Sequence, residues 1–194
     1  WELYYRTGDL KVLKDNYEMM KKWCDYHTSE ATNNISHMST VGDWLQPYSQ
    51  QKDDRRGDTP NTLISSAFYA HSVYLTMKSA EVLGFQEDAK HYQELLNRIS
   101  KAFENEFFDA NGKIKAPYTP TQTGYLLALG FNILSKETAN KSINHLVQLI
   151  KDRGTHLRTG FIGTPLLAPV LDKTGHSDLL YEILLKETYP SWFY

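Results

Sequence analysis

The chain has 194 residues, 41% of them hydrophobic, and a formal net charge of −2 at pH 7. This length suits one ordinary domain, and the hydrophobic share is enough for a core. The near-balanced charge excludes a basic field of the kind that holds nucleic acid or an anionic membrane. The single cysteine, Cys24, excludes an intramolecular disulfide framework and a cysteine-based zinc site, so we expect a buried, inert thiol.

Both ends of the sequence look cut from the middle of a longer protein. The chain begins at Trp1 without Met or a signal-peptide pattern, and it ends on the aromatic-rich stretch 190–194. Chain termini are normally polar and frayed. No apolar run approaches the ~20 residues that span a membrane. We therefore expect residues 1–194 to form a single domain that is truncated at both ends, and the compartment stays open.

Helical periodicity extends over nearly the whole chain. Residues that favour helix starts, some of them followed by proline, mark most of the expected elements. The expected helices run from the N-cap Asp9 to about His27, from Thr59-Pro60 to about Gly84, from about Glu87 to Phe107, from Thr119-Pro120 through Gln122–Leu129, from Ser135 to about Asp152, from Thr164-Pro165 through Leu171, and from His176-Ser177 to about Glu187. Strand patterns are confined to two short candidate hairpins, near Lys113–Lys115 and His156–Arg158.

The expected helices alternate between two kinds. Helices that are apolar on more than one side should be buried, and they begin near Pro60, Thr121 and Pro165. Helices with a single apolar stripe should be peripheral, and they begin near Leu10, Glu87, Lys136 and Asp178. Alternating inner and outer helices predict an all-α (α/α) toroid or an α-solenoid, and the long, irregular connections favour the toroid.

The number of helices is too small for a closed ring. A six-pair toroid has two helices in every pair, and the sequence supplies only about seven in total. An open arc leaves the flanks of its inner helices unpaired and exposes a large apolar patch. We therefore expect an incomplete (α/α)6 toroid, whose missing partners come from the remaining segments of the parent chain or from a second copy.

The segment Gln50–Asp58 is rich in charge and is typical of a solvated loop. Its carboxylates, Asp53, Asp54 and Asp58, alternate with basic residues and lack the spacing of an EF-hand. The histidines show no HExxH spacing, and no GxSxG, GxGxxG or P-loop pattern occurs. We expect neither a metal nor a cofactor.

Four segments, in this order and on alternating helices, carry a family resemblance. They are Gly42-Asp43-Trp44-Leu45, Thr121–Tyr125, His156–Pro165 and Glu187–Trp192. Their order and spacing resemble the catalytic toroid of bacterial α-L-rhamnosidases, glycoside hydrolase family 78. The resemblance covers nearly the whole chain. It implies a bacterial protein, cytoplasmic or exported, that acts on a rhamnose-containing glycan or glycoside and binds neither nucleic acid nor membrane.

The resemblance also implies a mechanism, hydrolysis of terminal α-L-rhamnose with inversion. Such a reaction needs one carboxylic acid and one carboxylate, ~6.5–9.5 Å apart. In the family, the acid lies upstream of the segment that matches Trp1, and the base lies in a Trp-Glu segment downstream of Trp192. We therefore assign no catalytic residue and expect the isolated chain to be inactive. Phe193 stands where the family usually has a glycine.

Toroid active sites gather where inner helices begin, and this places four of the six candidate substrate-binding residues; the resemblance alone supplies the other two. By resemblance, Trp44 is a stacking wall of the rhamnose pocket, and Trp192 and Tyr194 are aromatic residues of its rim. Each of three polar residues has a functional and a structural interpretation. Asp43 binds a sugar hydroxyl or caps a turn, and Gln122 lines the cavity floor or packs between helices. His156 contacts substrate or forms a structural hydrogen bond. Phe161 is expected in the core. The alternative function is a non-catalytic α-solenoid module for binding or scaffolding.

Overall fold

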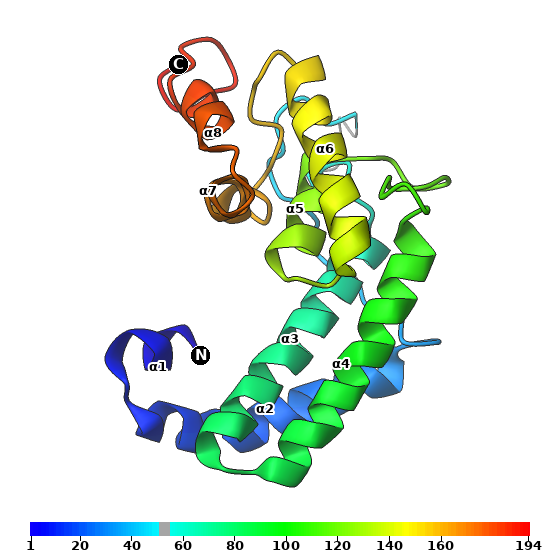
Figure 1. The fold of residues 1–194 in the computed structure, drawn as a ribbon, viewed down its shortest axis with the longest axis vertical. Coiled ribbons are helices and arrows are strands. Elements are labelled where there is room, and N and C mark those ends of the chain that lie inside the picture. The colour runs from blue at the N-terminus through cyan, green and yellow to red at the C-terminus, as the bar shows by residue number, and fades with distance from the viewer. Residues whose placement is uncertain (51–54) are drawn as a thin grey trace.

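The computed structural model describes residues 1–50 and 55–194, which form eight α-helices joined by turns and loops (Figure 1). The helices are α1 (Glu2–Thr7), α2 (Leu10–Glu30), α3 (Asn61–Leu83), α4 (Gln86–Phe107), α5 (Gln122–Gly130), α6 (Lys136–Asp152), α7 (Thr164–Lys173) and α8 (Ser177–Leu184). In this described part, β-structure is limited to two isolated bridges, Thr32 with Ile35 and Phe108 with Ile114. The all-α prediction is confirmed. Asp53 and Asp54 lie outside the described residues.

Several helix ends follow the expected chemistry, and one does not. The Asp9 carboxylate accepts the Lys11 N–H at 2.8 Å, and the Ser135 hydroxyl accepts the Thr138 N–H at 3.3 Å, so both cap their helices as predicted. Thr59 was expected to cap α3, which is wrong: α3 begins after Pro60 without a side-chain cap. The Thr59 hydroxyl instead forms a 2.7 Å hydrogen bond with the hydroxyl of Thr121, at the start of α5.

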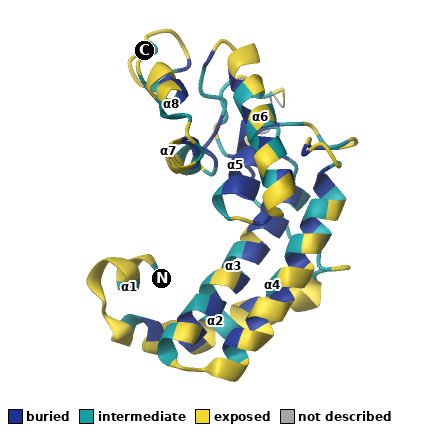
Figure 2. Cartoon of the chain, in the orientation of Figure 1, coloured by how far each residue is buried: buried dark blue, intermediate teal, exposed yellow. Residues whose placement is uncertain are grey.

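The helices form two layers. In the inner row, α3 packs against α5, and α5 packs against α7. Each inner helix also carries an outer partner, which is α4 on α3, α6 on α5 and α8 on α7. Figure 2 shows α5 buried on nearly every side, while α4 and α6 alternate buried and exposed stripes. This division confirms the predicted alternation, and the hydrophobic core lies between the two layers.

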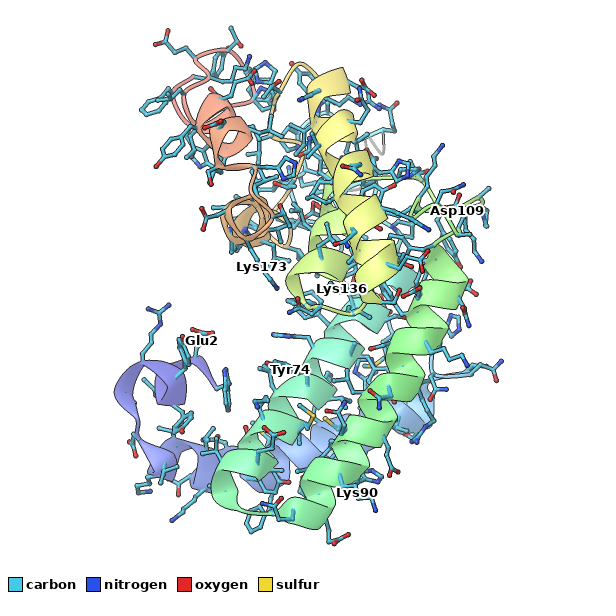
Figure 3. All side chains as sticks on the ribbon, in the orientation of Figure 1. Glu2, Tyr74, Lys90, Asp109, Lys136 and Lys173 are labelled. Carbon is cyan, nitrogen blue, oxygen red and sulfur yellow. The ribbon has the colours of Figure 1, made fainter. Side chains whose placement is uncertain are left out.

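The arc is open. Figure 1 shows the chain curving from α1 at one arm to α7 and α8 at the other. Large apolar side chains stay exposed along the arc, among them Phe68 and Tyr74 of α3 and Met19 of α2; Tyr74 lies on the concave side (Figure 3). Such a surface is typical of a face that another part of the protein covers. No helix of the described residues is long and apolar enough to cross a membrane.

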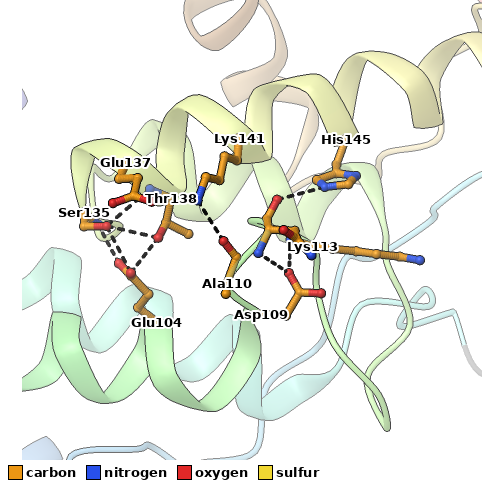
Figure 4. Close-up of polar contacts among 10 residues, drawn as sticks. Glu104, Asp109, Ala110, Lys113, Ser135, Glu137, Thr138, Lys141 and His145 are labelled. Carbon is orange, nitrogen blue, oxygen red and sulfur yellow. Dashed lines mark hydrogen bonds and ion pairs between the residues drawn. The ribbon is translucent and has the colours of Figure 1, made fainter.

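Polar contacts join α4 to the start of the next outer helix, α6 (Figure 4). The Glu104 carboxylate of α4 accepts the Ser135 N–H at 2.6 Å, the Ser135 hydroxyl at 3.0 Å and the Thr138 hydroxyl at 2.6 Å. Burial opposes the charged form of Glu104, but these hydrogen bonds outweigh it and lower the pKa of the carboxyl. Glu104 therefore links α4 to the start of α6 most strongly when it is ionised.

Cys24 lies in the core between α2 and α3. Its side chain is fully buried, and Sγ is 3.2 Å from the Thr76 hydroxyl. Burial raises the pKa of the Cys24 thiol, which keeps it in the unreactive protonated form. The expectation of a buried thiol is confirmed.

Candidate functional site

The first turns of neighbouring inner helices lie close together. The hydrogen bond between the hydroxyls of Thr59 and Thr121 joins the starts of α3 and α5. The starts of α5 and α7 also approach closely, since a Cβ added at Gly163 would lie 2.2 Å from the Thr123 hydroxyl oxygen. The loops before the inner helices and the first turns of these helices are therefore brought together, and they carry three of the four family-like segments.

Asp43 connects these segments through hydrogen bonds; we call this set of contacts the Asp43 junction. Its side chain is fully buried. One carboxylate oxygen accepts the Thr123 hydroxyl and the Gly160 N–H at 2.7 Å, and the other accepts the N–H groups of Ile162 at 3.0 Å and Gly163 at 3.1 Å. Hydrogen bonds to a carboxylate are stronger than neutral ones. Asp43 thus ties its own loop to the first turn of α5 and to the loop before α7, and both oxygens are occupied within the chain.

Backbone contact holds Trp44 against the loop before α7. The Phe161 N–H donates to the Trp44 carbonyl oxygen at 3.0 Å. A Cβ at Gly160 would lie 2.3 Å from the carbonyl oxygens of both Asp43 and Trp44, so only glycine permits this approach. The Trp44 side chain is half-buried, which leaves part of the ring open to solvent.

The expectation that Phe161 belongs to the core is wrong. Its side chain is 69% exposed. The N–H groups on either side of Phe161, from Gly160 and Ile162, both point to the Asp43 carboxylate, and the Phe161 N–H points to Trp44. With its backbone turned inward, the residue presents its ring outward. Sequence reasoning missed this aromatic group beside Trp44, although the glycines at 160 and 163 were a signal that the loop is tightly held.

Gln122 organises the same loop from the first turn of α5. Its side-chain amide donates to the His156 carbonyl oxygen at 3.0 Å and accepts the Arg158 N–H at 2.9 Å. It therefore occupies the backbone groups that a hairpin at 156–158 would have used, and no bridge forms there among the described residues. Gln122 is buried. Its amide thus contacts loop backbone, next to the cavity that its residue lines.

His156 joins this loop to the C-terminal segment. Its side chain is half-buried, and Nε2 lies 3.2 Å from the Thr188 hydroxyl. The other ring nitrogen, Nδ1, is buried without a hydrogen-bond partner in the described part of the chain. One face of the histidine is therefore fixed, and the second nitrogen retains hydrogen-bonding capacity.

The C-terminal aromatic residues are the most exposed of the six candidates. Trp192 is 49% exposed and Tyr194 is 81% exposed. The Tyr194 ring packs on Tyr189 with the ring centroids 5.4 Å apart, and Tyr189 packs in turn on Tyr48, with the centroids 5.2 Å apart. The segment therefore reaches the loop that follows Trp44. Asp43, Trp44, Gln122 and His156 form one connected network, while Trp192 and Tyr194 lie on a segment attached to it.

A cavity of about 240 Å³ adjoins this network and includes residues that sequence reasoning did not single out. Tyr48, Arg153 and Arg158 line it together with Gln122. The guanidinium carbon of Arg158 lies 4.4 Å from the centroid of the Tyr48 ring. Nothing in the spacing of these residues signals the pairing, because 110 positions of the chain separate Tyr48 from Arg158.

Comparison with known proteins gives consistent results. The family described as the bacterial alpha-L-rhamnosidase 6 hairpin glycosidase domain matches residues 1–194. An alpha-L-rhamnosidase of Formosa agariphila is 52% identical over 194 residues, which are 100% of this chain and 21% of that protein. An alpha-L-rhamnosidase of Alteromonas sp. (strain LOR) is 55% identical over 197 residues, with coverage of 100% and 21%.

The fold has a solved counterpart. The crystal structure of Streptomyces avermitilis alpha-L-rhamnosidase complexed with L-rhamnose is similar, with a TM-score of 0.89 and 36% sequence identity. The match covers 100% of this chain and 18% of that chain. The chain spans about a fifth of the length of the relatives it matches.

Proposed function

Since this chain belongs to the bacterial alpha-L-rhamnosidase six-hairpin glycosidase family, we propose that it forms part of the catalytic domain of an enzyme that hydrolyses terminal α-L-rhamnosides. In this proposal Trp44 is the stacking wall of the rhamnose pocket, and Trp192 and Tyr194 lie at its rim. Asp43, Gln122 and His156 set the position of the pocket loops.

The observation that carries the proposal is the Asp43 junction. A fully buried carboxylate with four donors from two other elements fixes the backbone directly before Trp44. Sugar binding depends on such rigid placement, because a pocket that is loose by about 1 Å loses much of its effect. A stacking residue on a loop is useful only when that loop is fixed, and Asp43 supplies the fixation.

We further propose inversion, with the acid and the base both supplied by parts of the enzyme outside residues 1–194. Two of the carboxylates that the structure describes in these loops are engaged. Asp43 has four donors, and Asp58 accepts from the Gln46 amide at 2.8 Å, the Ser49 hydroxyl at 3.0 Å and the Gln50 N–H at 2.9 Å. A general acid or base needs a free oxygen within reach of the scissile bond or the attacking water. Neither residue offers one, which supports external catalytic carboxylates.

The test is hydrolysis of 4-nitrophenyl α-L-rhamnoside by the enzyme that contains this chain, followed by ¹H NMR. We expect the first-formed sugar to be β-L-rhamnose, with 4-nitrophenyl β-D-glucoside as the unreactive control. An α-anomer formed first would overturn inversion, and no turnover of the rhamnoside would overturn the proposed activity. Turnover by residues 1–194 alone would show that the chain holds its own acid and base.

A further inference from the structure

The cavity beside the candidate site is built from three separate parts of the chain. Tyr48 and Asp58 come from the loop before α3, Thr121 and Gln122 from the start of α5, and Arg153 and Arg158 from the segment after α6. Its volume is about 240 Å³. Pockets for drug-sized ligands measure roughly 300–1,000 Å³, so this one has room for a single sugar residue.

Two arginines bring positive charge to the cavity, and no described residue forms an ion pair with either of them. Within the described ranges, 1–50 and 55–194, neither Arg153 nor Arg158 forms an ion pair, and the Nε of Arg158 is buried without a hydrogen-bond partner. Burial, and after it the positive charge of Arg153, lower the pKa of Arg158, and both arginines line the same cavity. An anion between them would relieve this repulsion.

Asp58, an acidic residue that lines the cavity, is not the anion that pairs with the two arginines. The Asp58 carboxylate already accepts hydrogen bonds from Gln46, Ser49 and Gln50, so it holds its own loop in place. It attracts Arg158 only in part, since the balance of effects still lowers the pKa of that guanidinium. Among the described residues that line the cavity, two are cations and one is an anion, so their charges sum to a positive value.

The start of α5 adds to this field. Thr121, the N-cap of this nine-residue helix, lines the cavity, and the positive end of a helix dipole favours anions. The Arg158 guanidinium carbon lies 4.4 Å from the centroid of the Tyr48 ring, a cation–π contact that holds the guanidinium group in place. Guanidinium groups held in this manner bind carboxylate or sulfate oxygens in pairs.

We propose that this cavity binds the anionic group of an acidic sugar, a carboxylate or a sulfate ester, on the residue to which the rhamnose is attached. The inference rests on the proposed function and names the substrate class of the same site. Gln122 connects the two regions, because it lines the cavity and also fixes the loop from His156 to Arg158. Arg158 and Arg153 are then specificity-determining residues.

The experiment compares three rhamnosyl disaccharides as substrates of the enzyme that contains this chain. Their second sugar is a neutral hexose, a hexuronate or a sulfated hexose, and the measured quantity is kcat/KM for each acidic substrate divided by kcat/KM for the neutral one. We expect this ratio to exceed roughly tenfold for at least one acidic substrate, as a charge-assisted hydrogen-bond pair supplies. Of the two acidic substrates, the one with the higher ratio shows whether the cavity prefers a carboxylate or a sulfate ester.

Two variants connect the preference to the cavity. Arg158→Gln and Arg153→Gln should each lower the ratio severalfold toward one, and Arg153 is exposed, so its replacement leaves the packing intact. The matched control is Lys151→Gln, an exposed cation on the last turn of α6 that does not line the cavity; it should keep the wild-type ratio. A wild-type ratio near one, or a ratio unchanged in both arginine variants, would overturn the inference alone. Failure to hydrolyse any of the three substrates would overturn the proposed function and the inference with it.

Discussion

The Asp43 carboxylate and the Gly160 N–H meet at 2.7 Å although 117 positions of the chain separate them. This hydrogen bond joins the loop that carries Trp44 to the loop before α7. The same two loops touch where glycine is required, since a Cβ at Gly160 would lie 2.3 Å from the carbonyl oxygens of Asp43 and Trp44. The position of Trp44 therefore depends on the Asp43 carboxylate and on the absence of a side chain at Gly160.

Gly160→Ala should force these loops apart. The added methyl group meets backbone atoms that cannot rotate away, and overpacking of this kind costs about 1–3 kcal/mol. We expect a lower midpoint of thermal unfolding and a higher KM for 4-nitrophenyl α-L-rhamnoside in the enzyme that contains this chain. Gly130→Ala is the matched control, because its methyl group would meet only the ends of the Leu166 and Val170 side chains. Equal unfolding midpoints and equal KM values for the two variants would contradict the close approach at Gly160.

Asp43→Asn should weaken the junction while keeping its shape. The amide retains one acceptor oxygen and turns an NH₂ group toward buried donors, so about two hydrogen bonds are lost and roughly 1–3 kcal/mol of stability with them. Differential scanning calorimetry measures this loss, and rhamnoside kinetics should show a reduced kcat/KM. Asp25→Asn, which changes an exposed carboxylate of α2, serves as the control. An Asp43→Asn variant with the wild-type unfolding midpoint would contradict the role of the carboxylate.

Glu104 should make the contact between α4 and α6 sensitive to acid. Its pKa is lowered in the folded state, so its contribution to stability is present above the unfolded pKa, about 4.3, and is lost as the pH falls through the folded value. In Glu104→Gln, the midpoint of thermal unfolding should therefore fall less between pH 7 and pH 4 than in the wild type. Glu94→Gln, on an exposed site of the same helix, should retain the wild-type slope. Parallel pH profiles for Glu104→Gln and the wild type would refute this contribution.

Most of the architecture could be predicted from local patterns. The alternation of all-apolar and single-stripe segments is a property of each helix by itself, so it predicts the two layers without knowledge of tertiary contacts. The short helix α1 was missed because none of its residues is buried, which leaves no apolar stripe to detect. The last helix ends at Leu184, earlier than the expected Glu187. Inner helices of 23, 9 and 10 residues also differ too much for the even pairs that the α-solenoid alternative requires.

The site could be predicted only in part. The four segments indicate which loops matter, but the partners of a side chain in another loop depend on the packing of the whole arc. Asp43 illustrates this limit, because its donors lie 80 to 120 positions away and no local pattern reveals them. The pairing of Tyr48 with Arg158 has the same origin. Roles in substrate binding stay predictions for all six candidates, Asp43, Trp44, Gln122, His156, Trp192 and Tyr194.

The most direct measurement of the central claim is the KM of Trp44 variants for 4-nitrophenyl α-L-rhamnoside in the enzyme that contains this chain. Loss of an aromatic anchor in a binding pocket weakens binding by about tenfold or more, so Trp44→Ala should raise KM by that factor, and Trp44→Phe should restore most of the affinity because a flat ring remains. Trp23→Ala, at an exposed tryptophan of α2, should leave KM unchanged. A KM for Trp44→Ala equal to that of the wild type would contradict the assignment of this chain as the sugar-contacting part of the enzyme.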